Sequence, residues 1–348
     1  MNTPTQAPYA ELDPATVLDA LQDAGLPSDG RLLQLNSYEN RVYQVPLDDG
    51  RVVVSKFYRP GRWSDAQILE EHGFAAELAA AELPVAAPLA LQADAARGTV
   101  RVDPRAPTLA FFATATGSEF RFAVSERWAG RAPELERPDT LAWIGRLLAR
   151  MHRVGARSSF QHRRTLNAAT FGHAPRQRLL DGGFVHPEVE GAWVAASAAA
   201  LAEVDAAFER HGSVHSIRLH GDCHSGNVLW RDEGAGAGPH FVDLDDACTG
   251  PAIQDLWMLL PGERQAVEAA LHHLLDGYRD FMEFDDRELL LIEPLRTLRM
   301  IHHSAWLAER WGDPAFPIAF PWFESPSYWQ QQATELREQV ERMQEVMR

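Results

Sequence analysis

The sequence predicts an α+β fold with two lobes, a small N-lobe built on an antiparallel sheet and a larger, mostly helical C-lobe. Short runs rich in β-branched and aromatic residues dominate the first part of the chain, and long helical patterns begin at residue 138. A stretch of short strands and acids, residues 219–246, interrupts the helical part. The length of 348 residues suits two lobes, which we place at residues 1–114 and 115–348.

The N-lobe is expected to begin with a helix over residues 13–24, with Pro14 at its first position and Gly25 after its end. Three strands are predicted next, and a Leu-Asp-Asp-Gly turn before the third favours a hairpin; they cover residues 32–35, 41–45 and 52–58. Lys56 lies on the third strand among partly apolar neighbours, where a charged amine needs a partner. An exposed lysine on an edge strand is the alternative.

A helix is predicted from residue 64 to about residue 82, opened by a capping box between Ser64 and Gln67. Its apolar side, marked by Ile68 and Leu78, also carries Glu71. A buried carboxylate is the natural partner of a partly buried ammonium group. We therefore choose Glu71 as the partner of the strand lysine, with Glu70 as the alternative.

Two more strands are predicted at residues 88–92 and 109–114. The Thr-Gly-Ser break at residues 116–118 is interpreted as the hinge between the lobes, with adenine lying against residues 109–113. The C-lobe helices are predicted over residues 138–152, 191–210, 263–281, 287–310 and 327–347. The polar, irregular segment between the first two of them is a candidate for acceptor selection.

The central stretch carries the chemistry. Between two short strands, the loop Gly-Asp-x-x-x-x-Asn places Asp222 five residues before Asn227, and Asp243 follows a third short strand. Phosphoryl transfer from Mg-ATP needs one acid to accept the proton of the incoming hydroxyl, and oxygen ligands to hold Mg²⁺. The spacing therefore predicts Asp222 and Asp243 as catalytic residues, with Asn227 and Asp243 as the metal ligands. A chance hairpin with surface acids is the alternative.

Other polar residues have simpler expected roles. Asp255, at the start of a later helix, is expected to accept backbone N–H groups and brace the catalytic loop; an ordinary first-turn acid is the alternative. His152 and His162 lack metal-ligand spacing and are expected to be satisfied polar residues.

Composition limits the partners and the compartment. A net charge of −16 argues against nucleic acid as the main partner. No run of about 18 apolar residues predicts a membrane span, and residues 1–10 lack a signal pattern. Two cysteines, Cys223 and Cys248, fit a reducing compartment and are expected to be ordinary buried or half-buried thiols. We expect a cytoplasmic protein, a monomer, with no nucleic-acid or membrane partner.

The motif His-Gly-Asp-x-x-x-x-Asn followed by Phe-Val-Asp-x-Asp resembles the aminoglycoside phosphotransferase and choline kinase branch of the protein-kinase-like fold. Longer strings resemble the stress response kinase A family more closely; they include L-N-S-Y-E-N-R-V-Y-Q from residue 35, K-F-Y-R-P-G-R-W from residue 56, L-P-V-A-A-P from residue 83, Q-D-L-W-M-L-L from residue 254 and D-P-A-F-P from residue 313. These strings span nearly the whole chain.

This resemblance implies a cytoplasmic serine/threonine protein kinase involved in stress survival, which takes ATP and Mg²⁺ and phosphorylates protein substrates. The proton acceptor of the family falls on Asp222, its magnesium ligands on Asn227 and Asp243, and its ATP-contacting serine on Ser37. Two features depart from standard protein kinases: N-S-Y-E-N replaces the glycine-rich loop, and Leu244 replaces the phenylalanine of D-F-G.

Two other functions stay open at this point. A phosphotransferase for small hydroxyl compounds, such as an aminoglycoside, choline or homoserine, would use the same catalytic stretch. A kinase-like binding module with weak catalysis would not need to keep Lys56, Asp222, Asn227 and Asp243 together.

Overall fold

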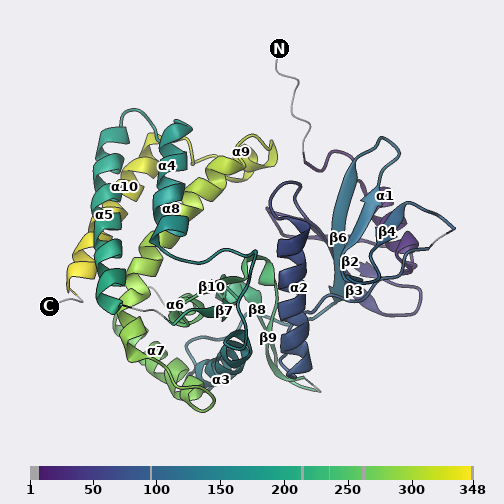
Figure 1. The fold of residues 1–348 in the computed structure, drawn as a ribbon, viewed down its shortest axis with the longest axis horizontal. Coiled ribbons are helices and arrows are strands. Elements are labelled where there is room, and N and C mark those ends of the chain that lie inside the picture. The colour runs from purple at the N-terminus through teal and green to yellow at the C-terminus, as the bar shows by residue number, and fades with distance from the viewer. Residues whose placement is uncertain (1–7, 95, 213–214, 235, 261–263, 346–348) are drawn as a thin grey trace. The chain divides into compact units, whose positions relative to one another are not determined.

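The computed structural model describes residues 8–94, 96–212, 215–234, 236–260 and 264–345, so most of the N-terminal ten residues lie outside the described part. The chain folds into two compact units (Figure 1). The first unit contains the chain up to residue 133 together with residues 225–245, and the second contains residues 134–224 and the chain from residue 246. The first unit extends beyond residue 114, because β6 (Glu119–Glu126) pairs with β3 (Val52–Phe57) in the same sheet. The predicted α+β class, with an antiparallel sheet and a helical part, is confirmed.

The first unit is built on a six-stranded antiparallel sheet of order β1-β2-β3-β6-β5-β4. Its other strands are β1 (Leu33–Leu35), β2 (Arg41–Pro46), β4 (Val100–Val102) and β5 (Ala110–Ala113). Helix α1 (Pro14–Asp23) buries Val17 and Leu21 against Val53 and Phe57 of the sheet. Helix α2 (Asp65–Ala80) lies alongside the sheet in Figure 1 and buries Ile68 in a separate apolar cluster.

The alternation of side chains along β3 decides where Lys56 points. Val53 and Phe57 belong to the apolar core that α1 covers, so Lys56 points to the opposite face of the sheet. There it lies between Val42 of β2 and Ala123 of β6 in the strand register. The predicted helices of this unit and its first three strands are confirmed within two residues, including the capping box of α2.

The interpretation of residues 116–118 as the hinge is wrong. These residues form the hairpin turn between β5 and β6, closed by a 2.8 Å bond from the Thr114 N–H to the Ser118 carbonyl. Gly117 has a φ of +96° there, which glycine adopts without strain. The strand predicted at residues 88–92 is absent among the described strands; Pro88 makes one isolated bridge to Ser125, since proline has no N–H to extend a ladder.

The first unit also contains a hairpin from the centre of the sequence, formed by β8 (Val228–Arg231) and β9 (Gly238–Phe241). The Phe241 N–H donates to the Pro84 carbonyl at 2.8 Å, and Trp230 pairs with Arg131 in an isolated bridge. These bonds attach the hairpin to segments of the first unit that are more than 90 residues away in the sequence. The residues after β9 are therefore held in this unit.

The second unit is mostly helical, with β7 (Ile217–Leu219) and β10 (Cys248–Gly250) paired antiparallel. Its helices are α3 (Pro138–Gly155), α4 (Ala174–Asp181), α5 (Glu190–His211), α6 (Ile253–Trp257), α7 (Arg264–Arg279), α8 (Ile292–Glu309), α9 (Ala315–Ala319) and α10 (Pro326–Glu345). The long predicted helices are confirmed, although residues 263, 346 and 347 of the predictions lie outside the described residues. The sequence analysis did not predict α4 or α9.

Two glycines allow α3 and α7 to pack closely. A Cβ atom on Gly145 would lie 2.0 Å from the Leu274 carbonyl oxygen, and one on Gly277 would lie 1.9 Å from the Ala142 carbonyl oxygen.

Helix α5 packs against α10, where the rings of Trp193 and Trp329 meet edge to face. Among the described residues, α5 is long and apolar enough to cross a membrane, but it also packs as a core helix.

Candidate active site

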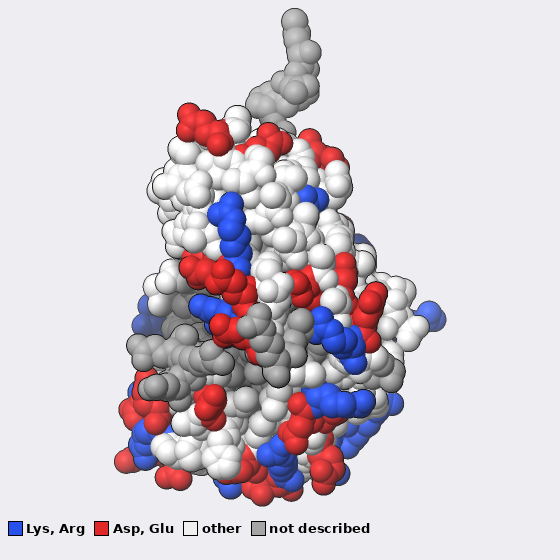
Figure 2. Space-filling model, turned by 90° about the vertical axis from the view of Figure 1, so that its left-hand side faces the viewer, with Lys and Arg blue, Asp and Glu red and all other residues white. Residues whose placement is uncertain are grey.

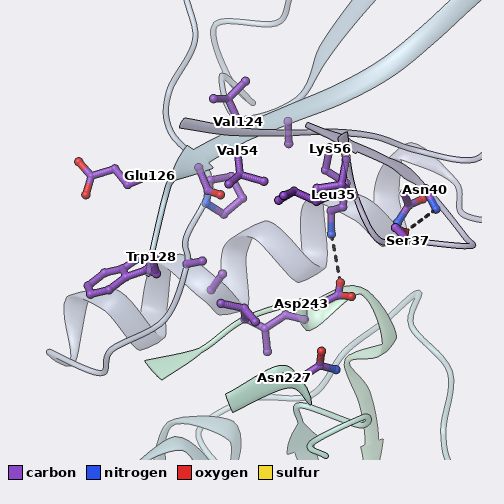
Figure 3. A pocket seen from close by; sticks show the side chains of 18 of the residues that line it. Leu35, Ser37, Asn40, Val54, Lys56, Val124, Glu126, Trp128, Asn227 and Asp243 are labelled. Atoms are coloured by element: carbon purple, nitrogen blue, oxygen red, sulfur yellow. Dashed lines mark hydrogen bonds and ion pairs between the residues drawn. The ribbon is translucent and has the colours of Figure 1, made fainter. Parts of the chain in front are cut away.

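The first unit contains a pocket of about 350 Å³, a size typical of small-molecule sites. Its apolar lining includes Leu35, Val42, Val54, Ala75, Val124, Leu229 and Val242. Ser125, Glu126 and Trp128 line it at the end of β6. Figure 3 shows Trp128 at one side of the pocket and Lys56 at the other, pointing toward Asp243. The pocket therefore has an apolar part that suits a nucleotide base and a charged part that suits phosphates.

This lining corrects the expected position of adenine. Residues 109–113 do not line the pocket, and the segment from Ala123 to Trp128 does. The sequence analysis missed this segment because it did not predict β6. An alternating pattern of apolar and polar residues in Glu119–Glu126 was the available signal.

Lys56 is surrounded by three carboxylates of the first unit. Its Nζ atom lies 3.2 Å from Glu71 Oε1, 3.4 Å from Asp245 Oδ1 and 3.8 Å from Asp243 Oδ1. Burial of the ammonium group opposes its charge, but these acids, led by Glu71, raise the pKa of Lys56 well above its ordinary value. The expected pairing with Glu71, rather than Glu70, is present in the structure.

Asn227 and Asp243 approach each other through the backbone. The Asn227 carbonyl accepts the Val242 N–H at 3.0 Å, which places the two predicted ligands on adjoining segments. Asp243 has a φ of +60°, an uncommon conformation for a residue with a side chain, and its carboxylate is 56% exposed. Both residues line the pocket. One carboxylate and one amide oxygen suit Mg²⁺, which usually takes few protein ligands and completes its coordination with phosphates and water.

A cluster of buried charges lies beside these residues, which the sequence analysis did not predict. The Asp245 carboxylate accepts a short bond from Arg62 and a 3.1 Å bond from the Asn40 amide. Arg62 also lies 3.6 Å from Glu39, which forms a 3.0 Å ion pair with Arg59. We call Glu39, Asn40, Arg59, Arg62 and Asp245 the buried charge cluster. Its residues come from three of the sequence strings quoted above: the string from residue 35, the string from residue 56 and the Phe-Val-Asp-x-Asp motif. The second acid of that motif, Asp245, was the feature of the sequence that could have indicated the cluster.

Ser37 lies in the turn that replaces a glycine-rich loop, and it lines the pocket. Its Oγ atom accepts the Asn40 N–H at 3.2 Å, as serines in turns often do. The side-chain oxygen of Asn40, Oδ1, in turn accepts the backbone N–H of Arg59 at 3.1 Å. The turn over this part of the pocket is therefore held by side-chain hydrogen bonds.

The second unit holds Asp222 in a braced loop. The buried Asp255 carboxylate accepts the N–H groups of His220 and Gly221, both at 2.8 Å, as the sequence analysis expected. His152 lies 3.1 Å from the same carboxylate and 2.8 Å from the Tyr278 hydroxyl, so it is a satisfied polar residue, also as expected. Gly221 has a φ of +85°, and a Cβ atom there would lie 2.2 Å from the Asp246 carbonyl oxygen. Glycine is therefore required at this turn.

Asp222 itself contacts two basic side chains. Arg299 of α8 donates from Nη1 to Asp222 Oδ1 at 2.7 Å, and His224 Nε2 lies 3.5 Å from Oδ2. Burial favours the protonated acid, but the hydrogen bond of His224 and the charge of Arg299 hold the pKa of Asp222 below its ordinary value. Asp222 is therefore a carboxylate at physiological pH. Nothing in the sequence pattern indicated Arg299, which lies 77 residues further along the chain.

Comparison with known proteins agrees with this combination of fold and residues. Residues 31–292 match the phosphotransferase enzyme family. A solved structure of amicoumacin kinase hAmiN with AMP-PNP, Ca²⁺ and Ami has the same fold, with a TM-score of 0.70, 18% identity and coverage of 94% of this chain and 93% of that one. The chain therefore belongs to the phosphotransferase enzyme family, and it is a phosphotransferase.

Two curated relatives are much more similar in sequence. Stress response kinase A of Escherichia coli strain K12 is 42% identical over 337 residues, which cover 97% of this chain and 95% of the relative. Serine/threonine protein kinase RdoA of Salmonella typhimurium is 42% identical over 332 residues, which cover 95% of this chain and 94% of the relative. Within the larger family, the chain therefore belongs with the stress response kinase A proteins.

Proposed function

We propose that this protein is an ATP-dependent serine/threonine protein kinase that phosphorylates proteins and acts in a stress response. The observation that carries the proposal is the 42% identity, over nearly the whole chain, to relatives named for that activity. The pocket of the first unit and the braced Asp222 of the second support the proposal.

In the proposed nucleotide site, the apolar part of the pocket takes adenine and Lys56 faces the phosphates. Asn227 and Asp243 would hold Mg²⁺, whose charge offsets the negative charge of the phosphate oxygens when it is bound. Glu71 keeps the Lys56 ammonium group oriented through their 3.2 Å bond. Ser37 lines the pocket, and in this proposal its hydroxyl group contacts ATP.

In the proposed step, Asp222 accepts the proton of a serine or threonine hydroxyl. The hydroxyl oxygen forms a bond to the γ-phosphorus, the bond from that phosphorus to the bridging oxygen breaks, and ADP leaves with the bond's electron pair. A low pKa makes Asp222 a weak base. A weak base is adequate because phosphoryl transfer has a loose transition state in most analyses, with little need for a strong nucleophile.

The second candidate is a phosphotransferase for a small hydroxyl compound. The fold of amicoumacin kinase, at a TM-score of 0.70, favours it, as does the His-Gly-Asp form of the catalytic loop. A binding module without turnover has less support, because Lys56, Asp222, Asn227 and Asp243 are all retained.

The partners and the compartment are part of the proposal. We propose a cytoplasmic monomer that binds ATP and protein substrates, without nucleic acid or membrane partners. The net charge of −16 supports the first exclusion, and Figure 2 shows basic side chains interspersed with acidic ones on the face that it presents.

Incubation of the purified protein with γ-labelled ATP and Mg²⁺ tests the proposal, with a mixed protein panel, an aminoglycoside, choline and homoserine as acceptors. We expect label on serine or threonine of a protein acceptor, and a rate of labelling at least about 100-fold lower with Asp222→Asn. Label on a small alcohol alone would overturn the protein kinase assignment. Nucleotide binding without transfer to any acceptor would favour the binding module.

A further inference from the structure

The catalytic loop has no arginine or lysine of its own. Between Asp222 and Asn227 the sequence is Cys-His-Ser-Gly, so the only basic side chain inside the loop is His224. Phosphoryl transfer spreads negative charge over the oxygens of the group in transit, and enzymes of this kind place a positively charged donor there. A side chain outside the loop can supply it.

Arg299 is a candidate for such a side chain in the second unit. Its bond to Asp222 and its 3.8 Å contact with the Met258 sulfur both use Nη1. Nε and Nη2 of Arg299 make no hydrogen bond to the described residues, and the side chain is 45% exposed. A guanidinium group with unused donors in a planar fork is well suited to bind a phosphoryl group.

Arg299 is also held on rigid structure. One turn earlier on α8, Arg296 stacks over the Trp257 ring at 5.5 Å, and Trp257 donates to Gln254 at 3.0 Å. Gln254 then donates to the Gly221 carbonyl at 3.0 Å, next to Asp222. These contacts fix α8 relative to the catalytic loop within one unit, so the proximity of Arg299 to Asp222 is supported by neighbouring packing.

We propose that Arg299 is a catalytic residue that contacts the phosphoryl group as it reaches the acceptor hydroxyl at Asp222. The proposal rests on the proposed function in taking Asp222 as the base. The acceptor oxygen must lie within about 3 Å of the Asp222 carboxylate, and the phosphorus is bound to that oxygen in the product. Arg299 keeps its proton throughout, and its bond to Asp222 also orients the carboxylate. The positive charge stabilises the phosphoryl oxygens in transit and the new phosphate ester.

The test is Arg299→Ala, with Arg337→Ala on the exposed side of α10 as the matched control. We expect kcat for phosphotransfer to fall about 10²- to 10³-fold in Arg299→Ala, with ATP affinity changed less than about twofold. Millimolar guanidinium should restore part of kcat in this variant and should not affect the control. Arg299→Lys should give an intermediate kcat, because it keeps the charge and loses the fork.

A kcat within about threefold of the wild type in Arg299→Ala would overturn the proposal. So would a loss of kcat that guanidinium does not restore and that Arg299→Lys does not lessen, since a structural role predicts that result. The acceptor separates the two proposals. If the wild type transfers phosphate to a small alcohol alone, the protein kinase assignment fails, whereas the role of Arg299 can still be measured with that acceptor. If the wild type transfers phosphate to no acceptor, both fail.

Discussion

The two units hold their functional acids by different means. In the first unit, Asp245 lies among cations in the buried charge cluster, and Lys56 has three acids around it. In the second unit, Asp255 is fully buried. Its carboxylate accepts hydrogen bonds from two backbone N–H groups and lies 3.1 Å from Nε2 of His152. Ion pairs thus organise the proposed site for the triphosphate, and backbone hydrogen bonds organise the loop that carries Asp222, the proposed base. Ion pairs therefore dominate the first site, whereas in the second unit the ion pair between Arg299 and Asp222 adds to a loop that is braced by backbone hydrogen bonds.

The largest expected effect follows from Asp243→Ala. Its carboxylate is the only acid among the two proposed metal ligands, so Mg²⁺-dependent nucleotide binding and turnover should both fall by more than about 10³-fold. Titration calorimetry with and without Mg²⁺ measures the binding. Asp103→Ala, an exposed acid of the same unit, is the control. Wild-type affinity for Mg-ATP in Asp243→Ala would remove it as a ligand.

Asp222→Asn should separate the base from the nucleotide site. We expect phosphotransfer to fall about 10²- to 10⁴-fold with ATP affinity nearly unchanged, because the amide cannot accept the proton. Single-turnover kinetics and nucleotide titration check the two parts. Asp276→Asn, an exposed acid of α7, should behave as the wild type. Near-normal turnover of Asp222→Asn would sink the assignment of the base.

Asp245→Asn tests the buried charge cluster. The substitution removes the buried carboxylate that forms ion pairs with Arg62 and Lys56. We therefore expect the free energy of unfolding to fall by about 3 kcal/mol. ATP affinity should fall about tenfold, because Asn40 and Lys56 lose the carboxylate that holds them. The matched control is Glu119→Gln, which breaks an exposed ion pair with Arg101 and should change stability by less than about 1 kcal/mol. Equal effects in denaturant unfolding of the two variants would contradict the assignment.

Glu288 of the second unit predicts a pH dependence. Burial raises its pKa to about 7, although the Ile253 N–H donates to it at 2.8 Å. The folded state therefore binds this proton more tightly than the unfolded state, and the stabilisation is complete below about pH 4.5 and lost as the pH rises through 7. Glu288 should therefore lower the free energy of unfolding of the wild type by about 2 kcal/mol between pH 5 and pH 8, and Glu288→Gln should remove this decline. If denaturant unfolding gave free energies that fall equally with pH in both proteins, the prediction would be wrong.

The smallest effect is expected at the cysteines. Cys223 and Cys248 are buried and free, and burial, with Asp255 nearby, raises the pKa of both thiols. A protonated, inaccessible thiol reacts slowly with peroxide. Mild peroxide should therefore leave activity unchanged in the wild type and in Cys223→Ser. Reversible inhibition of the wild type, absent in the variant, would show a redox role.

The sequence predicted the parts of the site that depend on local pattern. The helical spacing of Ile68 and Leu78 marked the buried face of α2, so Glu71 could be chosen over Glu70. The Gly-Asp-x-x-x-x-Asn pattern marked the loop of Asp222, in which the structure requires a glycine at position 221. The sequence did not predict contacts that depend on packing between distant segments. Arg62 meets Asp245 across 183 residues and Arg299 meets Asp222 across 77, and no local periodicity encodes either.

The return of residues 225–245 to the first unit has a consequence for how the protein is made. Phe241, fully buried, bonds to Pro84 and Ala86, so strand pairing in this unit joins segments about 155 residues apart. During synthesis, the residues up to 133 emerge well before this hairpin exists, because the whole first segment of the second unit, residues 134–224, is translated in between. Contacts of such long sequence separation form late and slowly. The surface of the nascent first unit that binds Phe241 therefore stays uncovered until residues 225–245 have been synthesised.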